Sequence, residues 1–337
     1  MKNRLSELGE FGLIARIRER APLRPGALVL GPGDDAALLA LPAGWDLVLT
    51  CDLQLEGRHF TRERMTPREL GARAIEVNLS DLAAMGALPV AALVSLGLPA
   101  DLPVSVVDAL YEGMTASLAP HAAALAGGNI TRADSLIVDV TLAGRVESGR
   151  ALRRSGARAG EIVFVTGFPG RAAAALAGFA AGPGIWDGPA GERFRLFHAT
   201  PTARVAAGRF LLENEAAGAA IDQSDGLGGD LAHIAEESRV RIVLEEEHLP
   251  LDPEVEGLAA MLGVDPLDWV LGPSDDYELI FTTPRARASL AFAMGASLGL
   301  AVTPIGEVVA GEPGVALRRR DGSIAAIGAG WDHLRAQ

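Results

Sequence analysis

The sequence predicts an α/β protein, α+β in its overall mixture, built from two domains. Short apolar runs alternate with helical patterns along the whole chain. The chain has 337 residues, whereas a single hydrophobic core stops growing at about 250–300 residues. A polar, basic and turn-rich run, SGRALRRSGARAG at Ser148–Gly160, interrupts the pattern. We therefore expect one domain over residues 1–150 and a second over residues 151–337.

The first half reads as alternating strands and helices. The clearest helix begins with Pro67 in its first turn and ends before Gly86, the arrangement that proline and glycine favour at helix ends. The expected elements are a helix near Gly9–Arg20, strands at Ala27–Leu30 and Asp46–Leu53, a helix at Pro67–Met85, a strand at Val90–Leu98, a helix at Pro103–His121, and strands at Ala123–Gly127 and Ser135–Val146.

The second half continues in the same way after the strand EIVFVTG. Glycine, proline and aspartate separate the apolar runs, as expected of turns between strands and helices. The expected elements are helices at Gly170–Ala181 and Ala203–Ala217, a strand ending at Asp222, a helix after Gly226, strands at Val240–Leu244 and Asp276–Thr283, a helix at Pro284–Leu298 and a strand at Ala301–Val309.

Charge and lysine content narrow the functional classes. The net charge is −13, which argues against nucleic-acid binding because that function needs a basic face. Lys2 is the only lysine. A Walker-type P-loop and Schiff-base catalysis are therefore excluded, since both need a suitably placed lysine. If the protein handles phosphates, it must use arginine, backbone N–H groups or metal ions.

Cysteine content and apolar runs bear on location. Cys51 is the only cysteine, which excludes an intrachain disulfide and a cysteine-based zinc site. The N-terminal residues are too charged for a signal peptide. Two uncharged stretches, Leu82–Ala100 and Ala288–Gly306, contain both glycine and proline, so they read as buried strands and turns rather than membrane spans. We expect a cytoplasmic protein.

The segment IDQSDGLGGDLAHI, Ile221–Ile234, places Asp222, Ser224 and Asp225 just before a helical pattern. One of these side chains could cap the helix, because its oxygen would accept an orphan backbone N–H. Alternatively, the oxygens could bind a hard cation such as Mg²⁺. This segment alone leaves the two interpretations equally balanced.

Other carboxylates recur where apolar runs end, as ligand-binding residues do in α/β sheets. Packed together, they would repel one another unless cations were present. The run GPGDDA also fits a dinucleotide fingerprint, but its two aspartates would face the pyrophosphate and Pro42 stops the next apolar run, so we reject that reading. The carboxylates are Asp34, Asp35, Asp52, Asp81, Asp222, Asp225, Asp275 and Asp276.

Taken together, the motifs GPGDDAALL, NLSDLAAMGALP, IDQSDGL and DYELIF, with the junction before EIVFVTG, resemble the thiamine-monophosphate kinases, of the aminoimidazole ribonucleotide synthetase superfamily. The similarity runs from GEFGLIARI to GWDHL. It implies the two-domain fold of aminoimidazole ribonucleotide synthetase, with a mixed-sheet N-terminal domain that forms a homodimer and a C-terminal α/β domain. It also implies ATP-dependent phosphorylation of thiamine monophosphate to thiamine diphosphate, assisted by a Mg²⁺ cluster.

The resemblance also implies roles for individual residues. The acceptor phosphate is already ionised at neutral pH, since its second pKa is about 6, so no residue is expected to act as a general base. His59 is therefore interpreted as a substrate contact. The implied metal ligands are Asp35, Thr50, Cys51, Asp52, Asp81, Asn129, Asp222 and Asp225; the ATP contacts are Gly128, Asn129, Arg154 and Ser224; and the substrate contacts are His59, Asp275 and Trp331.

Several positions depart from the family pattern. Asn129 stands in GGNIT where the family has a metal-binding aspartate, Cys51 stands for a threonine, and PSDDYE shortens the family's glutamate to Asp275. The segment ATPTAR lacks the family's first arginine. Two alternatives stay open: a related ATP-using enzyme with another small phosphorylated substrate, and a weak paralogue that binds nucleotide.

Overall fold

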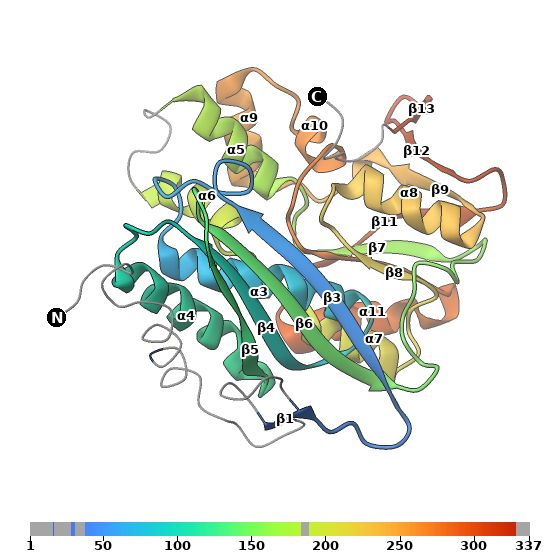
Figure 1. The fold of residues 1–337 in the computed structure, drawn as a ribbon. Coiled ribbons are helices and arrows are strands. Elements are labelled where there is room, and N and C mark those ends of the chain that lie inside the picture. The colour runs from blue at the N-terminus through green and yellow to red at the C-terminus, as the bar shows by residue number, and fades with distance from the viewer. Residues whose placement is uncertain (1–15, 17–27, 31–37, 183–188, 328–337) are drawn as a thin grey trace. The chain divides into compact units, whose positions relative to one another are not determined.

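The fold was analysed in a computed structural model that describes residues 16, 28–30, 38–182 and 189–327. These residues fall into two compact units. One lies within Met1–Leu82 and Ala87–Gly149, and the other within Ala83–Gly86 and Arg150–Gln337. Both units combine sheets with helices (Figure 1), as the predicted fold class requires. The helix expected near Gly9–Arg20 lies almost wholly outside the described residues.

The first unit contains a four-stranded mixed sheet in the order β3-β6-β4-β5. β6 pairs antiparallel with β3 and β4, whereas β4 and β5 run parallel. A separate two-stranded sheet joins β1 and β2. The elements are β1 (Leu28–Leu30), β2 (Leu38–Leu39), β3 (Trp45–Leu55), α3 (Pro67–Ala84), β4 (Leu88–Leu98), α4 (Val104–Leu118), the short 3-10 helix η1 (Ala119–His121), β5 (Ala124–Arg132) and β6 (Ile137–Glu147).

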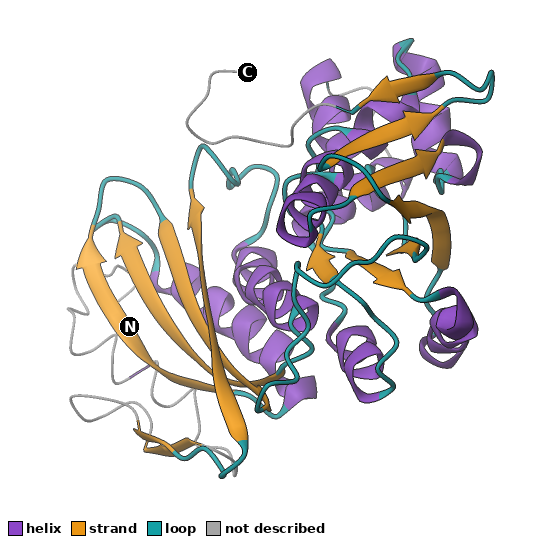
Figure 2. Ribbon diagram, turned by 90° about the vertical axis from the view of Figure 1, so that its right-hand side faces the viewer, coloured by secondary structure: helices purple, strands orange, loops and turns teal. Residues whose placement is uncertain are grey.

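Helices α3 and α4 lie on one face of this sheet (Figure 2). Their backbones approach closely because glycine stands at each contact. A Cβ on Gly71 would lie 2.0 Å from the Leu110 carbonyl oxygen, and one on Gly113 would lie 1.9 Å from that of Arg68. Fully buried Val140 and Leu142 of β6 belong to the core of this unit. The helix–sheet packing therefore fixes α3 and its Asp81.

The second unit contains a seven-stranded mixed sheet in the order β13-β12-β9-β11-β7-β10-β8. Only β9 and β12 pair in parallel, and the other neighbours are antiparallel. The strands are β7 (Ile162–Thr166), β8 (Ala220–Asp222), β9 (Arg241–Glu245), β10 (Leu279–Thr283), β11 (Val302–Val309), β12 (Gly314–Arg318) and β13 (Ile324–Ala326).

Helices pack on both faces of this sheet. On one face, Val163 and Ile280 share a buried cluster with Leu231 of α8. On the other, Phe164 stacks on Phe281 and meets Phe292 of α11 edge-on, with ring centroids 5.4 and 5.6 Å apart. The helices are α5 (Arg171–Ala181), α6 (Pro189–Ala199), α7 (Val205–Glu213), α8 (Leu227–Ser238), α9 (Pro253–Leu262), α10 (Pro266–Leu271) and α11 (Ala288–Leu298), with 3-10 helices η3 (Glu246–His248) and η4 (Arg285–Arg287).

Two details of the predicted elements were wrong. Asp52 does not end a strand, because β3 continues to Leu55 and Asp52 pairs with Val140 in its interior. β10 begins at Leu279 rather than at Asp276, because Tyr277 has a left-handed backbone with φ +54° that leaves the extended conformation. No helix among the described residues is long and apolar enough to span a bilayer.

Candidate functional site

In the first unit, a polar row on β3 contains Thr50, Asp52 and Gln54. Alternate side chains of a strand share a face, so these three point the same way. The Thr50 hydroxyl donates a hydrogen bond to an Asp81 carboxylate oxygen on α3. Gln54 is buried and accepts a 3.3 Å bond from Arg73 of the same helix. The strand therefore presents its polar row to α3, and it brings the predicted metal ligand Thr50 next to the predicted ligand Asp81.

Cys51 lies on the opposite face of β3. Its thiol is exposed and donates to an Asp139 carboxylate oxygen at 3.2 Å. The structure therefore does not bring this thiol together with Thr50 and Asp52. Gly128 and Asn129 lie within β5. A Cβ on Gly128 would lie 1.9 Å from the Val94 carbonyl oxygen, so glycine is needed for strand pairing there, while Asn129 is exposed.

His59 lies in the turn after β3. The Leu55 backbone N–H donates a 3.0 Å hydrogen bond to His59 Nδ1. A neutral imidazole that accepts at one nitrogen carries its proton on the other. His59 therefore presents Nε2 as a hydrogen-bond donor, which suits contact with an anionic oxygen.

In the second unit, Asp222 ends β8, and Ser224 and Asp225 lie in the loop between β8 and α8. None of them is the N-cap residue of the helix, because Gly226 occupies that position. Instead, Asp230 of α8 accepts the backbone N–H groups of Ser224 and Asp225, each at 3.2 Å. The capping interpretation was therefore wrong, and the loop is shaped by a residue that the sequence analysis missed.

Three buried or partly buried carboxylates lie close together around this loop. Asp230 is 1% exposed and Asp222 is 3% exposed. Burial, followed by repulsion from Asp222 and Asp225, raises the pKa of Asp230 to about 8. The three carboxylates are therefore close enough to disfavour one another's charge. The signal for Asp230 was its position in the first turn of the helix, between the apolar residues Leu227 and Leu231.

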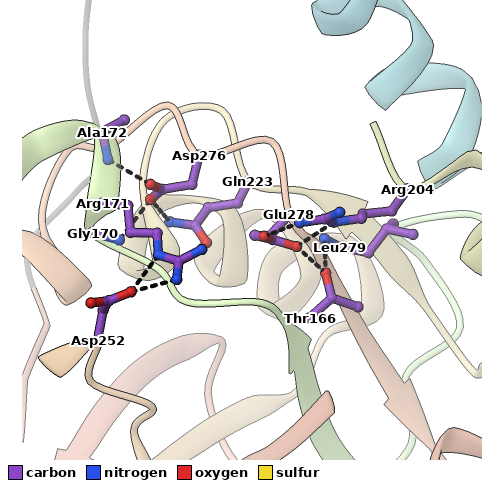
Figure 3. Close-up of polar contacts among 10 residues, drawn as sticks. All are labelled: Thr166, Gly170, Arg171, Ala172, Arg204, Gln223, Asp252, Asp276, Glu278 and Leu279. Carbon is purple, nitrogen blue, oxygen red and sulfur yellow. Dashed lines mark hydrogen bonds and ion pairs between the residues drawn. The ribbon is translucent and has the colours of Figure 1, made fainter. Parts of the chain in front are cut away.

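A second loop, just before β10, carries Asp275. One carboxylate oxygen of Asp275 lies 3.6 Å from Nδ1 of His198, a buried residue of α6. The next residue, Asp276, accepts backbone N–H groups from Gly170 and Ala172 at 2.7 and 2.8 Å (Figure 3). No role was predicted for His198, because α6 itself was not predicted.

Glu278 anchors the other end of this loop. It accepts hydrogen bonds from the buried Thr166 hydroxyl and from Arg204, whose Nε lies 2.7 Å from the carboxylate (Figure 3). Thr166 in turn accepts the Leu279 backbone N–H at 2.8 Å. Since Glu278 is 4% exposed, this ion pair fixes the start of β10.

The remaining predicted residues are placed as follows. The Arg154 side chain is exposed, and its carbonyl oxygen accepts a 2.8 Å bond from Ser238 of α8. Asp35 and Trp331 lie outside the described residues. Among the residues that are described, no group of three or more His, Cys, Asp or Glu side chains has the geometry to hold a metal ion.

Comparisons with known proteins define the class. Residues 33–146 match the family model for the AIR synthase related protein, N-terminal domain. The chain is 36% identical to the thiamine-monophosphate kinase of Escherichia coli strain K12, covering 97% of this chain and 98% of that protein. The N-terminal match identifies an AIR synthase-related domain within residues 33–146. The near full-length similarity then shows that the chain belongs to the thiamine-monophosphate kinase family.

Solved structures agree with this assignment. The crystal structure of the thiamine-monophosphate kinase from Stenotrophomonas maltophilia K279a matches with a TM-score of 0.83 at 37% identity, covering 94% of this chain and 98% of that one. AaThiL complexed with AMPPCP and TMP matches with a TM-score of 0.77 at 34% identity, covering 98% and 99%. The resemblance drawn from the motifs is thereby confirmed, and so is the predicted fold.

Proposed function

We propose that the protein transfers the γ-phosphoryl group of ATP to the phosphate of thiamine monophosphate, giving thiamine diphosphate and ADP. The observation that carries this proposal is the match over nearly the whole chain to a kinase structure complexed with AMPPCP and TMP. The acidic composition adds that the partners are small molecules rather than nucleic acid. We also propose that the protein works in the cytoplasm.

This reaction depends on the orientation of the two substrates more than on proton transfer. The acceptor phosphate is ionised at neutral pH, so its oxygen can attack without a general base, and the task is to align two polyanions. We propose His59, Asp275 and Trp331 as the substrate contacts. His59 suits this role because its Nδ1 accepts a backbone N–H, so the ring of a neutral imidazole carries its proton on Nε2, a donor of the kind that a phosphate oxygen accepts.

The oxygen donors present suit Mg²⁺. Asp222 and Asp225 raise the pKa of Asp230, so the loop concentrates negative charge that a divalent cation would offset. Mg²⁺ commonly binds through one or two carboxylates together with substrate phosphates. Bound Mg²⁺ would neutralise charge on the reacting phosphates. The proposed ligands are Asp35, Thr50, Asp52, Asp81, Asn129, Asp222 and Asp225.

For ATP, we propose contacts from Gly128, Asn129, Arg154 and Ser224. Arg154 offers the only charge among them, and its exposed guanidinium can bond a phosphate bidentately. Cys51 is left out of the metal set, because its thiol lies on the other face of β3.

We also propose a homodimer formed through the first unit. The sheet face opposite the polar row of β3 exposes four leucines, Leu47, Leu49, Leu53 and Leu93, at 46, 62, 43 and 44%. Leu93 and Cys51 both pair with Thr141, so these side chains share one face of the sheet. An apolar sheet face of this kind is typical of a protein–protein contact.

The proposed activity is tested with purified protein, Mg²⁺, ATP and thiamine monophosphate, with chromatographic detection of thiamine diphosphate. Product should form in proportion to ADP and stop when EDTA is added. The shortened Asp275 favours one second candidate, a kinase for another small phosphate monoester. ADP release with such an acceptor, but no thiamine diphosphate with thiamine monophosphate, would establish that alternative and refute the first.

A further inference from the structure

The Asp276 carboxylate receives donors from three separate segments. Gly170 and Ala172 donate from the start of α5, and Ser274 Oγ donates at 2.7 Å from the same loop. Gln223 Nε2 donates at 2.9 Å from the loop between β8 and α8 (Figure 3). This acid thus connects two loops and a helix end that are far apart in sequence.

Gln223 ties the two loops through its backbone as well. Its N–H donates to the Glu278 carbonyl, and its carbonyl accepts the Tyr277 N–H, both at 2.8 Å. The residue is fully buried, and among the described residues its Oε1 finds no hydrogen-bond partner. An unsatisfied buried polar atom costs about 1–3 kcal/mol, so a glutamine here needs a reason other than stability.

The backbone beside this link is strained. Tyr277 has φ +54°, and a non-glycine residue in that region costs about 1–3 kcal/mol. It is held between Asp276, bonded to Gln223 and α5, and Glu278, bonded to Arg204 and Thr166 (Figure 3). Strain that is anchored on both sides is characteristic of segments whose position matters for function.

We propose that the Gln223–Asp276 hydrogen bond is an internal link that sets the position of Asp275 relative to the loop of Ser224 and Asp225. Gln223 directly precedes Ser224, and Asp276 directly follows Asp275. Under the proposed function, these neighbours contact ATP, metal and acceptor. Gln223 and Asp276 are then positioning residues, which act by aligning the two substrates rather than by touching them.

The inference rests on the proposed function, and it predicts a specific kinetic pattern. Misplacement by about 1 Å can cost about a hundredfold in rate, whereas each substrate keeps its own contacts. Gln223→Met keeps the length of the side chain but removes the donor. We expect its kcat to fall between about tenfold and a hundredfold, while both KM values stay within about threefold of wild type.

A double-mutant cycle separates the link from two independent structural roles. Asp276→Leu removes the acceptor of the bond whose donor Gln223→Met removes, so the double variant should lose no more kcat than the worse single variant. Glu161→Gln is the matched control, since this buried acid accepts a 2.7 Å bond from Thr282 at the opposite end of β10. It should lower the melting temperature but leave kcat per folded molecule unchanged.

Amide hydrogen exchange gives a readout that needs no turnover. In wild type, Mg²⁺–ATP should slow exchange at residues 275–278, and in Gln223→Met this protection should be lost. If wild type shows this protection but makes no thiamine diphosphate, the proposed function is refuted while the proposed Gln223–Asp276 link stands. Unchanged kcat and protection in Gln223→Met, or losses in kcat that multiply in the double variant, would overturn the link.

Discussion

Replacing Gly226 with alanine should destabilise the second unit and weaken nucleotide binding. Gly226 has φ +105° and ψ +150°, a region that only glycine occupies readily. A Cβ there would lie 2.0 Å from the Gly272 carbonyl oxygen. Because that atom belongs to the backbone, no side-chain rotation can relieve the clash.

The expected loss of stability is the sum of the backbone strain at residue 226 and the cost of relieving the clash with Gly272. Backbone strain contributes about 1–3 kcal/mol, and the forced shift adds about 1–3 kcal/mol. The free energy of unfolding should therefore fall by about 2–6 kcal/mol. For a unit of this size, 1 kcal/mol corresponds to roughly 2–4 °C, so the melting temperature should drop by roughly 4–24 °C. The shift also displaces Asp225, so ATP affinity should fall.

The assay is a thermal melt monitored by circular dichroism, together with a titration that measures the ATP affinity of the folded protein. Gly257→Ala is the matched control, because Gly257 lies in α9 with nothing within 4 Å of a built Cβ. Alanine there should raise stability by about 0.5–1 kcal/mol, as expected of a helix interior. A Gly226→Ala variant that melts within a degree of wild type would refute the reasoning.

Three further outcomes are expected. Burial raises the pKa of Asp276 from 3.8 to about 6, so its contribution to stability is present below pH 3.8 and lost as the pH rises through 6. In urea unfolding, wild type should therefore lose up to about 3 kcal/mol of stability relative to Asp276→Asn between pH 4 and 7. A difference that stays constant with pH would contradict this. Asp81→Asn should abolish most turnover and the melting-temperature rise that Mg²⁺–ATP gives wild type; full activity would remove Asp81 from the proposed metal set. Leu49→Asp should convert a dimer into a monomer of 35.0 kDa by light scattering, because it buries a charge in the proposed interface. Met261→Asp, on α9 and 70% exposed against 62% for Leu49, should leave the dimer intact.

Much of the fold followed from local signals. Pro67 and Gly86 marked the ends of α3 to within two residues, and the uncharged run before Leu98 was indeed a strand. The missed helices α9 and α10 had signals too. Asp252 and Asp265 each precede a proline, and each caps its helix by accepting a backbone N–H two residues on. An aspartate followed by proline is a pattern typical of a helix N-terminus, and both pairs lie where helices begin.

The candidate site was harder to predict, because its geometry depends on contacts distant in sequence. Asp222 and Leu279 are paired across antiparallel strands, which brings the end of β8 next to the start of β10. Sequence periodicity shows that strands exist but does not give their order. For the same reason, the bonds that Asp276 receives from Gln223 and α5 could not be inferred before the sheet order was known.

The loop of Asp222 and Asp225 shows how an acidic protein can prepare for anionic ligands. With a pKa of about 8, Asp230 is mostly protonated at neutral pH, yet it still accepts the N–H groups of Ser224 and Asp225 through a carboxyl oxygen. Under the proposed function, Asp222 and Asp225 would bind Mg²⁺, and a third ionised carboxylate beside them would compete with a nucleotide phosphate for the charge of that ion. Burial of Asp230 in α8 therefore shapes the loop through its hydrogen bonds without adding a full third negative charge.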